Sequence, residues 1–582
     1  MSRTLLDSLR TNPPTSFSSL VSLVRQIEVS DESIEAEASV VILRNLTLDN
    51  IGPYLKYHLL RSNIKTEIVF GAYDNVHQEL LDPGSPVHSA PRSAVVLALW
   101  LARLDESWMD PNWSADSAIK RLQELFQLAA KQTTAMIGIN TFLPDSVSHT
   151  GPVQPKEFPS RDLEISRLNH FVRVYARDHG DRFFLIDWER LCANLGRESA
   201  LDARTWYLAK MPFTNRFLDV CALEVAKVVR ALKGKAKKAL VLDCDGTLWG
   251  GVVGEDGLEG IKLDPDEYPG NIFYAFQRSI IDLMTQGVAV VLNSKNNLDD
   301  VWEVLDNHPH CLLKRPHLSC FRINWQDKVT NLREIAAELN LGLDSFVFID
   351  DSGVECQLVR DHLPMVEVLR VPESLVQLPE LLFRDGLFNS LSKSQEDRNR
   401  TEMYRAEAKR QSEKSQFTNL DDFIASLEIV TKIERDPVHS LARVAQLIQK
   451  TNQFNLTTRR YSEGEIQAFL DAPDSAVYTL HVTDKYGEYG LTGLGIFKKE
   501  DNAVVIDTLL LSCRILGRAV EKRFLDHVMA ELQAEWRPTE WRAEYLVTKK
   551  NSQVLEFWER FGFEVVSQDE AGKRYRRGPA GV

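Results

Sequence analysis

Short apolar runs that alternate with amphipathic stretches constrain the fold of this chain more than any other feature of its sequence. The first group of such runs lies at residues 39–43, 66–70, 94–99, 135–139 and 183–186. A second group lies at residues 239–242, 288–292 and 346–349. Strands that alternate with helical segments are typical of parallel sheets with helices on both faces. The sequence therefore predicts an α/β fold with at least two parallel sheets.

The length of 582 residues is well above the size at which a single hydrophobic core stops growing. A basic segment at 233–238 precedes the second group of strands, and residues 392–415 carry dense mixed charge, which is typical of a solvated helix or linker. A third α/β region follows from about residue 429. We predict domains at residues 1–232, 233–390 and 429–582, with a charged helical linker at 391–428.

The formal net charge of -14 argues against non-specific electrostatic binding to nucleic acid or to an anionic membrane, because such binding needs clustered Lys and Arg. The seven cysteines are scattered singly, without the close pairs of a zinc site or a disulfide framework. The N-terminus lacks the apolar core of a signal peptide, and the most apolar stretch, residues 94–102, is too short to span a membrane. We expect a cytoplasmic protein that binds neither nucleic acid nor membrane.

Polar residues follow each strand of the second group, and ligands of open α/β sheets bind outside the carboxyl ends of the strands. Asp243 and Asp245 come directly after the first of these strands. One of these two carboxylates can attack phosphorus while the other handles the proton. Ser294 follows the second strand, where its hydroxyl can hold a phosphoryl oxygen, and Lys328 can supply a point charge for the same phosphate.

Asp350 and Asp351 follow the third strand of this group. Two adjacent carboxylates close to Asp243 and Asp245 need a cation to be tolerated together. Hard oxygen ligands of this kind favour Mg²⁺. The sequence therefore predicts a phosphate site and a Mg²⁺ site at the same edge of the second sheet.

These residues resemble the four ordered motifs of the haloacid-dehalogenase (HAD) phosphatases. The matching residues are Asp243-x-Asp245-Gly246-Thr247, Ser294, Lys328 and the pair Asp350 and Asp351. The resemblance implies a Rossmann-like parallel sheet with Asp243 as nucleophile and Asp245 as acid/base. It implies phosphate contacts from Thr247, Ser294 and Lys328. It also implies Mg²⁺ ligands among Asp243, Asp245, Asp350 and Asp351, with Asp351 preferred to Asp350 by position.

Residues 243–257 and 451–461 further resemble the FkbH-like branch of this superfamily, subfamily IIIC. The resemblance implies transfer of glyceryl from 1,3-bisphosphoglycerate, a phosphorylated three-carbon substrate, to an acyl carrier protein with release of phosphate. Such a reaction supplies units to polyketide-type secondary metabolism. Gly246 departs from the pattern, because many members carry Asn there. A small-molecule phosphatase, a lactyl-transferring variant and a non-catalytic carrier-binding module remain as alternatives.

Cys244 has two interpretations. A thiolate at this position could carry the glyceryl group as a thioester, which makes Cys244 a candidate catalytic residue. Side chains alternate along an extended segment, however, so Cys244 should point away from Asp243 and Asp245. Cysteine is also among the residue types that are most often buried.

The first region resembles a degenerate SGNH-hydrolase-like domain, on the basis of residues 45–49 and 68–73. A working hydrolase of that kind needs a Gly-Asp-Ser nucleophile turn and a late Asp-x-x-His. Neither is present where expected, and Asp187 is followed by Trp-Glu-Arg. We expect a binding or scaffolding role for this domain.

The third region resembles the GNAT acyltransferases, which implies a mixed sheet and a site for coenzyme A. The resemblance rests on residues 503–519, on Asn551 and on residues 557–563. It implies that Arg514, Gly517, Ala519 and Asn551 contact coenzyme A or the phosphopantetheine arm of a carrier protein. The pattern Arg514-x-x-Gly517 could also be a simple helix start. Trp558 stands where catalytic members often have Tyr, which disfavours independent acetyl transfer, although a GNAT acyltransferase remains an alternative.

Overall fold

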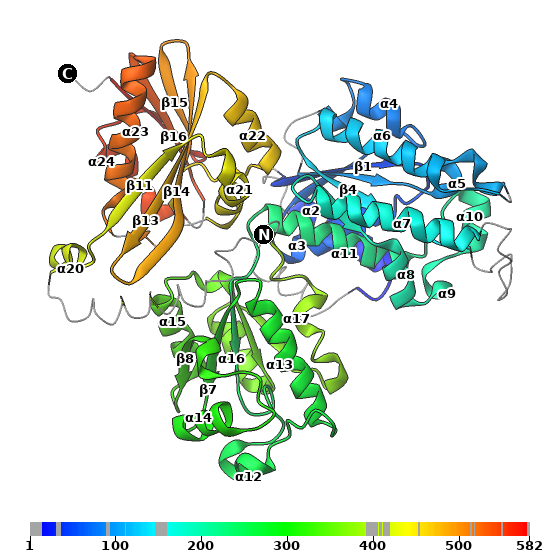
Figure 1. The fold of residues 1–582 in the computed structure, drawn as a ribbon, viewed down its shortest axis with the longest axis horizontal. Helices are drawn as coiled ribbons and strands as arrows, with labels where there is room; N and C mark the ends of the chain where they lie inside the picture. Colours follow the sequence, from blue (N-terminus) through cyan, green and yellow to red (C-terminus); the bar gives the residue numbers. More distant parts are fainter. Residues whose placement is uncertain are drawn as a thin grey trace. The chain divides into compact units, whose positions relative to one another are not determined.

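The structure is a computed structural model, and it contains three α/β regions, each with its own sheet (Figure 1). The described residues are 14–30, 36–88, 93–110, 112–145, 160–390, 406, 410, 419–451, 454–512, 515–516, 518–548 and 551–578. Most of the predicted charged linker, as well as Arg514 and Gly517, lies outside the described residues. The chain divides into two compact units, Met1–Lys233 with Ser462–Glu465 and Gly234–Tyr461 with Ile466–Val582.

The first sheet has five parallel strands in the order β2-β1-β3-β4-β5. The strands are β1 (Ala38–Arg44), β2 (Thr66–Phe70), β3 (Ala94–Ala98), β4 (Met136–Asn140) and β5 (Phe183–Ile186). The helices are α2 (Phe17–Ser30), α3 (Ile51–Arg61), α4 (Val76–Leu81), α5 (Leu101–Leu104), α6 (Asp116–Gln132), α7 (Arg161–Asp178), α8 (Trp188–Leu195), α9 (Arg197–Ala200), α10 (Ala203–Ala209) and α11 (Asn215–Leu232). Alternate residues of β1 face opposite sides: Val41 packs with α6 and α7, whereas Val40 packs with α3 and α11.

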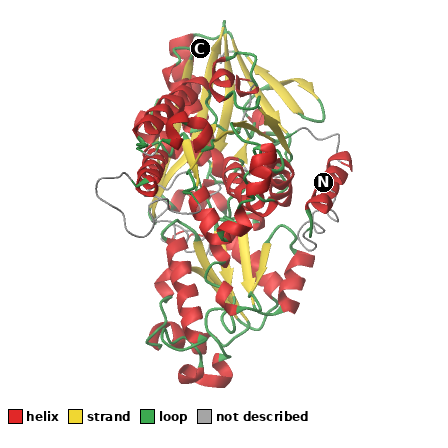
Figure 2. Ribbon diagram, turned by 90° about the vertical axis from the view of Figure 1, so that its right-hand side faces the viewer, coloured by secondary structure: helices red, strands yellow, loops and turns green. Residues whose placement is uncertain are grey.

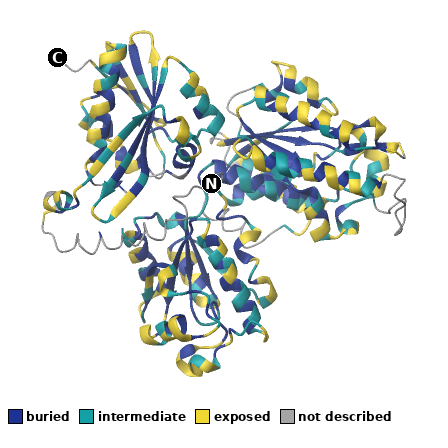
Figure 3. Cartoon of the chain, in the orientation of Figure 1, coloured by how far each residue is buried: buried dark blue, intermediate teal, exposed yellow. Residues whose placement is uncertain are grey.

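The central sheet also has five parallel strands, in the order β10-β9-β6-β7-β8. The strands are β6 (Ala239–Leu242), β7 (Ala289–Ser294), β8 (Leu318–Ile323), β9 (Phe346–Asp350) and β10 (Glu367–Arg370). The helices are α12 (Val253–Gly260), α13 (Gly270–Met284), α14 (Leu298–Asn307), α15 (Lys328–Glu338), α16 (Gly353–His362) and α17 (Leu381–Arg384). Helices lie on both sides of these strands (Figure 2), and β6, β7 and β9 are buried along their whole length (Figure 3). The strand order reverses at β6, which creates the crevice where ligands bind in such sheets.

The third sheet is mixed, with the strand order β11-β13-β14-β15-β16-β18-β17 and β12 paired to β15. The strands are β11 (Val430–Arg435), β12 (Phe454–Asn455), β13 (Ser475–Asp484), β14 (Gly487–Glu500), β15 (Ala503–Leu511), β16 (Glu540–Leu546), β17 (Glu564–Gln568) and β18 (Gly572–Arg577). The helices are α20 (Leu420–Ser426), α21 (Leu441–Lys450), α22 (Glu463–Asp471), α23 (Val520–Trp536) and α24 (Phe557–Arg560). Only β15 and β16 pair in parallel among these strands.

The three sheets confirm the predicted fold class, two parallel α/β sheets followed by a mixed one. Short 3₁₀ helices lie at Pro86–His88, Glu106–Met109, Arg315–His317, Leu343–Ser345, Leu375–Gln377, Val438–Ser440 and Ser552–Val554. Within the described parts of the chain, none of the helices combines the length and the apolar character that crossing a bilayer would require.

Candidate active site

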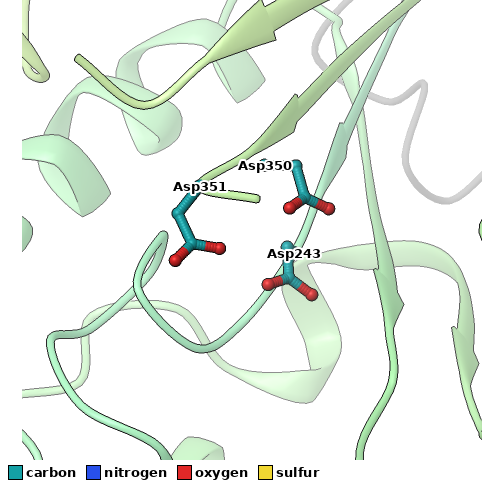
Figure 4. A group of neighbouring side chains, drawn as sticks. All are labelled: Asp243, Asp350 and Asp351. Carbon is teal, nitrogen blue, oxygen red and sulfur yellow. The ribbon is translucent and has the colours of Figure 1, made fainter. Parts of the chain in front are cut away.

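The strands of the central sheet bring three acidic residues to one edge. Asp243 directly follows β6, and Asp350 is the last residue of β9, the parallel neighbour of β6. The backbone N–H of Asp243 donates to the carbonyl of Ile349 at 3.0 Å, which keeps the two strand ends together. One carboxylate oxygen from each of Asp243, Asp350 and Asp351 lies within 4.8 Å of the other two, and the three side chains lie close together beside the strand ends (Figure 4).

Lys328 lies at the centre of this acidic group. It is the first residue of α15, which begins there because the Asp327 side chain caps the helix by accepting from the N–H of Thr330. Its Nζ donates to Oδ1 of Asp243 at 2.7 Å and to Oδ2 of Asp350 at 2.6 Å. Burial alone would lower the pKa of Lys328, but the charges of Asp243 and Asp350 outweigh it and raise that pKa. The ammonium group is therefore charged at neutral pH.

The acidic group fits a divalent cation. Burial and the nearby Asp243 carboxylate raise the pKa of Asp350 to about 6, although Lys328 opposes this shift. Three carboxylates against one ammonium leave excess negative charge, which a bound cation would offset. Asp350 already accepts from Lys328 and from the backbone N–H of Ser352, whereas Asp351 is exposed. Oxygen donors of this kind suit Mg²⁺.

The Asp245 carboxylate is not part of this group, in contrast to its prediction as a metal ligand. Its Oδ1 accepts from the indole N–H of Trp249 at 2.8 Å and from the backbone N–H of Val253 at 3.0 Å. Its Oδ2 accepts from Nδ2 of Asn296 at 2.8 Å. Burial raises the pKa of Asp245. The side chain is thus held in place as a separate acid/base candidate.

Sequence patterns did not assign roles to Trp249 and Asn296, although both lie inside the segments that carry the motifs.

The structure also explains why a glycine is present at position 246. Its φ is +66°, and a Cβ at this position would lie 2.5 Å from Oδ2 of Asp351. A glycine therefore allows the carboxylate of Asp351 to approach the turn after β6.

Cys244 is fully buried among apolar side chains that include Leu242 and Leu248. Burial, and then the charge of Asp243, raise the pKa of its thiol well above the usual value. The nearby Ser294 side chain, which is also buried, opposes this shift of the thiol pKa without reversing it. A buried thiol with a raised pKa is a poor nucleophile. These contacts weigh against the interpretation of Cys244 as a thioester carrier.

Thr247, a predicted phosphate contact, is completely buried in the turn after β6. Its Oγ1 has no hydrogen-bond partner within the part of the chain that the structure describes. Buried hydroxyl groups are usually paired, so the Thr247 hydroxyl is a donor that a ligand in this turn could use.

In the first region, Asp187 is buried and its carboxylate is engaged by several donors. It accepts from Nε of Arg173 at 3.1 Å, from Nη2 of Arg173 at 3.0 Å and from the hydroxyl of Thr141 at 3.0 Å. Burial alone would raise the pKa of Asp187, but these hydrogen bonds and the one from the backbone of Arg190 lower it. Asp187 is thus a structural carboxylate here.

The predicted coenzyme A residues of the third region are only partly described. Ala519 is exposed and has a φ of +56° immediately before α23. Asn551 is fully buried, and its Nδ2 donates to the carbonyls of Asn455 and Leu546. Its Oδ1 accepts from the Tyr545 hydroxyl and from the N–H of Thr548. All four positions of the amide are used within the protein, so Asn551 has a structural role in place of the predicted ligand contact.

Residues 454–456 fill the space where β15 and β16 separate. These two strands pair only over residues 503–506 and 540–543. Beyond this point, Leu456 bridges them: its N–H donates to the carbonyl of Leu509 at 3.2 Å, and its carbonyl accepts from the N–H of Leu546 at 2.9 Å. The strand β12 thus occupies the gap between β15 and β16.

No protein-family model and no curated protein matches the sequence. Among solved structures, the N-terminal part of BF1531 from Bacteroides fragilis, described as containing a phosphatase domain complexed with Mg, matches with a TM-score of 0.58 and 26% identity. The match covers 65% of this chain and 99% of that chain. The ribosomal-protein-S18-alanine N-acetyltransferase from Escherichia coli matches with a TM-score of 0.21 and 12% identity, over 26% of this chain and 96% of that chain. The first match shows that about two thirds of this chain share their fold with a protein that contains a phosphatase domain.

Proposed function

We propose that residues 233–390 form a Mg²⁺-dependent enzyme of the HAD type that releases phosphate at Asp243. The observation that carries this proposal is the buried group of Asp243, Lys328 and Asp350, with Asp351 beside it, at the carboxyl edge of a parallel sheet. The likeness to a protein whose phosphatase domain was crystallised with Mg supports the same class.

The residues suit attack on phosphorus. A carboxylate oxygen of Asp243 attacks the phosphoryl group, the bond from phosphorus to the leaving oxygen breaks, and Asp245 protonates that oxygen. The raised pKa of Asp245 favours this role, because the carboxyl then keeps its proton to a higher pH than a free aspartate does. Water next attacks the aspartyl phosphate, and Asp245 takes its proton. Lys328 offsets the charge of the phosphoryl oxygens, and the unpaired Thr247 hydroxyl can donate to one of them.

Asp243, Asp350 and Asp351 would hold Mg²⁺, with Asp351 the most accessible ligand. When bound, the ion supplies positive charge at the transferring phosphoryl group.

We further propose that the physiological substrate is the acyl phosphate 1,3-bisphosphoglycerate and that glyceryl passes to an acyl carrier protein. In this reaction the thiol of the carrier's phosphopantetheine arm attacks the carbonyl carbon. The bond from that carbon to the bridging oxygen breaks, phosphate leaves with the electron pair, and the thiol proton goes to Asp245. The resemblance of residues 243–257 and 451–461 to the FkbH-like branch supports this narrower assignment. The outer regions would serve as docking and scaffolding domains.

A plain phosphatase for a small metabolite is the second candidate. It is favoured by the burial of Cys244 and by the complete nucleophile and acid/base pair, which needs no further group for hydrolysis. The two candidates break different bonds: the phosphatase cleaves the bond between phosphorus and oxygen, whereas thiolysis cleaves the bond between carbon and oxygen.

Incubation in ¹⁸O-labelled water with Mg²⁺ and 1,3-bisphosphoglycerate, with and without a carrier protein, separates these candidates. Glyceryl transfer predicts a glyceryl mass shift on the carrier and released phosphate free of ¹⁸O. Hydrolysis at phosphorus predicts ¹⁸O in phosphate whether or not a carrier is present. Both candidates depend on Asp243, hydrolysis on its carboxylate as nucleophile and thiolysis on its carboxylate as one of the residues that would hold Mg²⁺. Phosphate release by Asp243→Asn at the wild-type rate would therefore contradict both and would favour a non-catalytic carrier-binding module or a GNAT acyltransferase.

A further inference from the structure

Arg370 lies at the same edge of the central sheet as the acidic group. It is the last residue of β10, and it pairs in register with Asp350 on the neighbouring strand β9. Adjacent strands lie about 4.8 Å apart. The side chain of Arg370 is exposed, so its guanidinium group can reach solvent beside the proposed active site.

The main chain around Asp351 holds this guanidinium in place. Nε of Arg370 donates to the backbone carbonyl of Asp351 at 3.2 Å. A Cβ built on Gly353 would lie 3.4 Å from Cζ and 3.4 Å from Nη1 of Arg370. The guanidinium therefore lies over the first residue of α16.

Arg370 differs in its pairing from two other cationic side chains at this edge, Lys328 and Lys295. Lys328 is paired with Asp243 and Asp350, and Lys295 forms an ion pair with Glu355 at 2.6 Å. Among the described residues, Arg370 forms no ion pair, and its one hydrogen bond uses Nε. Both terminal nitrogens thus remain able to donate to an incoming anion.

We propose that Arg370 binds a second anionic group of the substrate and thereby selects molecules that carry anions at both ends. This inference rests on the proposed release of phosphate at Asp243. The planar guanidinium presents paired donors that match the oxygens of a phosphate or carboxylate. The distance of one strand spacing between Asp350 and Arg370, together with the reach of the side chain, suits a short substrate such as a three-carbon molecule.

The test compares Arg370→Gln with the wild-type full-length protein on two acyl phosphates, 1,3-bisphosphoglycerate and acetyl phosphate. Only the first carries an anionic group at its far end. A lost charge-assisted interaction of this kind lowers kcat/KM for 1,3-bisphosphoglycerate on the order of 10- to 100-fold, mainly through KM. The loss on acetyl phosphate is expected to be at least about tenfold smaller by the same reasoning.

Arg360→Gln is the matched control. Arg360 is an exposed arginine on α16 that donates to the carbonyl of Val368 at 3.2 Å, and it lies further along the helix from the strand ends. This variant should not discriminate between the two substrates. Equal losses on both substrates in Arg370→Gln, or no loss on either, would overturn the role of Arg370.

A binding measurement keeps the inference independent of turnover. Titration of 3-phosphoglycerate, which carries a carboxylate and a phosphate at opposite ends, should show a Kd raised on the order of tenfold or more in Arg370→Gln. Wild-type protein that turns over neither acyl phosphate, with or without a carrier protein, would refute the proposed acyl phosphate substrate. An unchanged Kd for 3-phosphoglycerate in the variant would refute the role of Arg370.

Discussion

Replacement of Lys328 by methionine tests the electrostatic organisation of the acidic group directly. The substitution keeps the length of the side chain but removes a buried cation that contacts Asp243 at 2.7 Å and Asp350 at 2.6 Å. Lys328 is only 4% exposed, so water cannot replace its hydrogen bonds without a structural change. The carboxylates would face each other without compensation whenever no divalent cation is bound.

The expected cost is large. Loss of one partner from a buried ion pair destabilises a protein by about 3–5 kcal/mol. For a domain of this size, each kcal/mol lowers Tm by roughly 2–4 °C, so the metal-free transition should fall by about 6–20 °C. The pKa of Asp350 is already raised to about 6 from an unfolded value near 4, and loss of Lys328 raises it further. A carboxyl with a raised folded pKa stabilises when protonated, so both proteins should lose stability as pH rises through the window from about 4 to about 6. The variant should continue to lose stability above pH 6, where Asp350 has ionised in the wild type but not in the variant, so the difference between the two proteins should grow there.

Differential scanning calorimetry of the transition that Mg²⁺ shifts, performed in EDTA and in Mg²⁺ on both sides of this pH window, measures these effects. Lys295→Met is the control, because its ion pair with Glu355 is 39% exposed on the lysine side and should contribute no more than about 1 kcal/mol. Mg²⁺ should restore part of the lost stability in Lys328→Met. Equal shifts of Tm in the two variants in EDTA would refute the reasoning.

Three further predictions concern single side chains. Asp245→Asn should slow phosphate release by about 10²- to 10⁴-fold, since an amide cannot transfer the proton, and rapid-quench mass analysis should then detect phosphorylated enzyme; an unchanged rate would exclude Asp245 as the acid/base. Cys244→Ala should keep phosphate release and any glyceryl transfer while losing about 1 kcal/mol of stability, and loss of the carrier's mass shift alone would restore the thioester interpretation. Asp187→Asn should destabilise the first region above pH 4 but progressively less below it, because the pKa of Asp187 is lowered in the folded state and its contribution disappears as pH falls through that pKa. Denaturant unfolding of both proteins between about pH 3 and pH 7 checks this, and a constant difference in stability would contradict it.

The convergence of Asp243 and Asp350 was predictable because it depends on topology alone. Parallel strands end at the same edge, so polar residues that directly follow β6 and β9 must lie close together. The sequence identified these strands because buried parallel strands are nearly continuous runs of apolar residues. The mixed third sheet was predicted instead from the resemblance of residues 503–519 and 557–563 to the GNAT acyltransferases.

The details around Asp245 were not predictable in the same way. Three donors hold its carboxylate away from the metal ligands, and two of them, the indole of Trp249 and the amide of Asn296, are side chains whose orientation depends on packing. The turn at Gly246 likewise depends on the approach of Asp351 from a strand more than a hundred residues later. Such contacts have no local pattern in the sequence.

Leu456, which lies in the segment 451–461 that resembles the FkbH-like branch, closes the gap between β15 and β16. A phosphopantetheine arm could form hydrogen bonds with β15 and β16 in this gap only if Leu456 lost its own hydrogen bonds to Leu509 and Leu546. The loss of each bond would cost about 0.5–1.5 kcal/mol. The side chain of Leu456 is also fully buried, and its exposure would cost about 1.5–3 kcal/mol. Together these costs would weaken binding in the gap by roughly 10²- to 10⁴-fold relative to an open one. A carrier protein that docks on the third region would therefore leave the gap closed and present its thiol elsewhere, which is consistent with chemistry confined to the acidic group at Asp243.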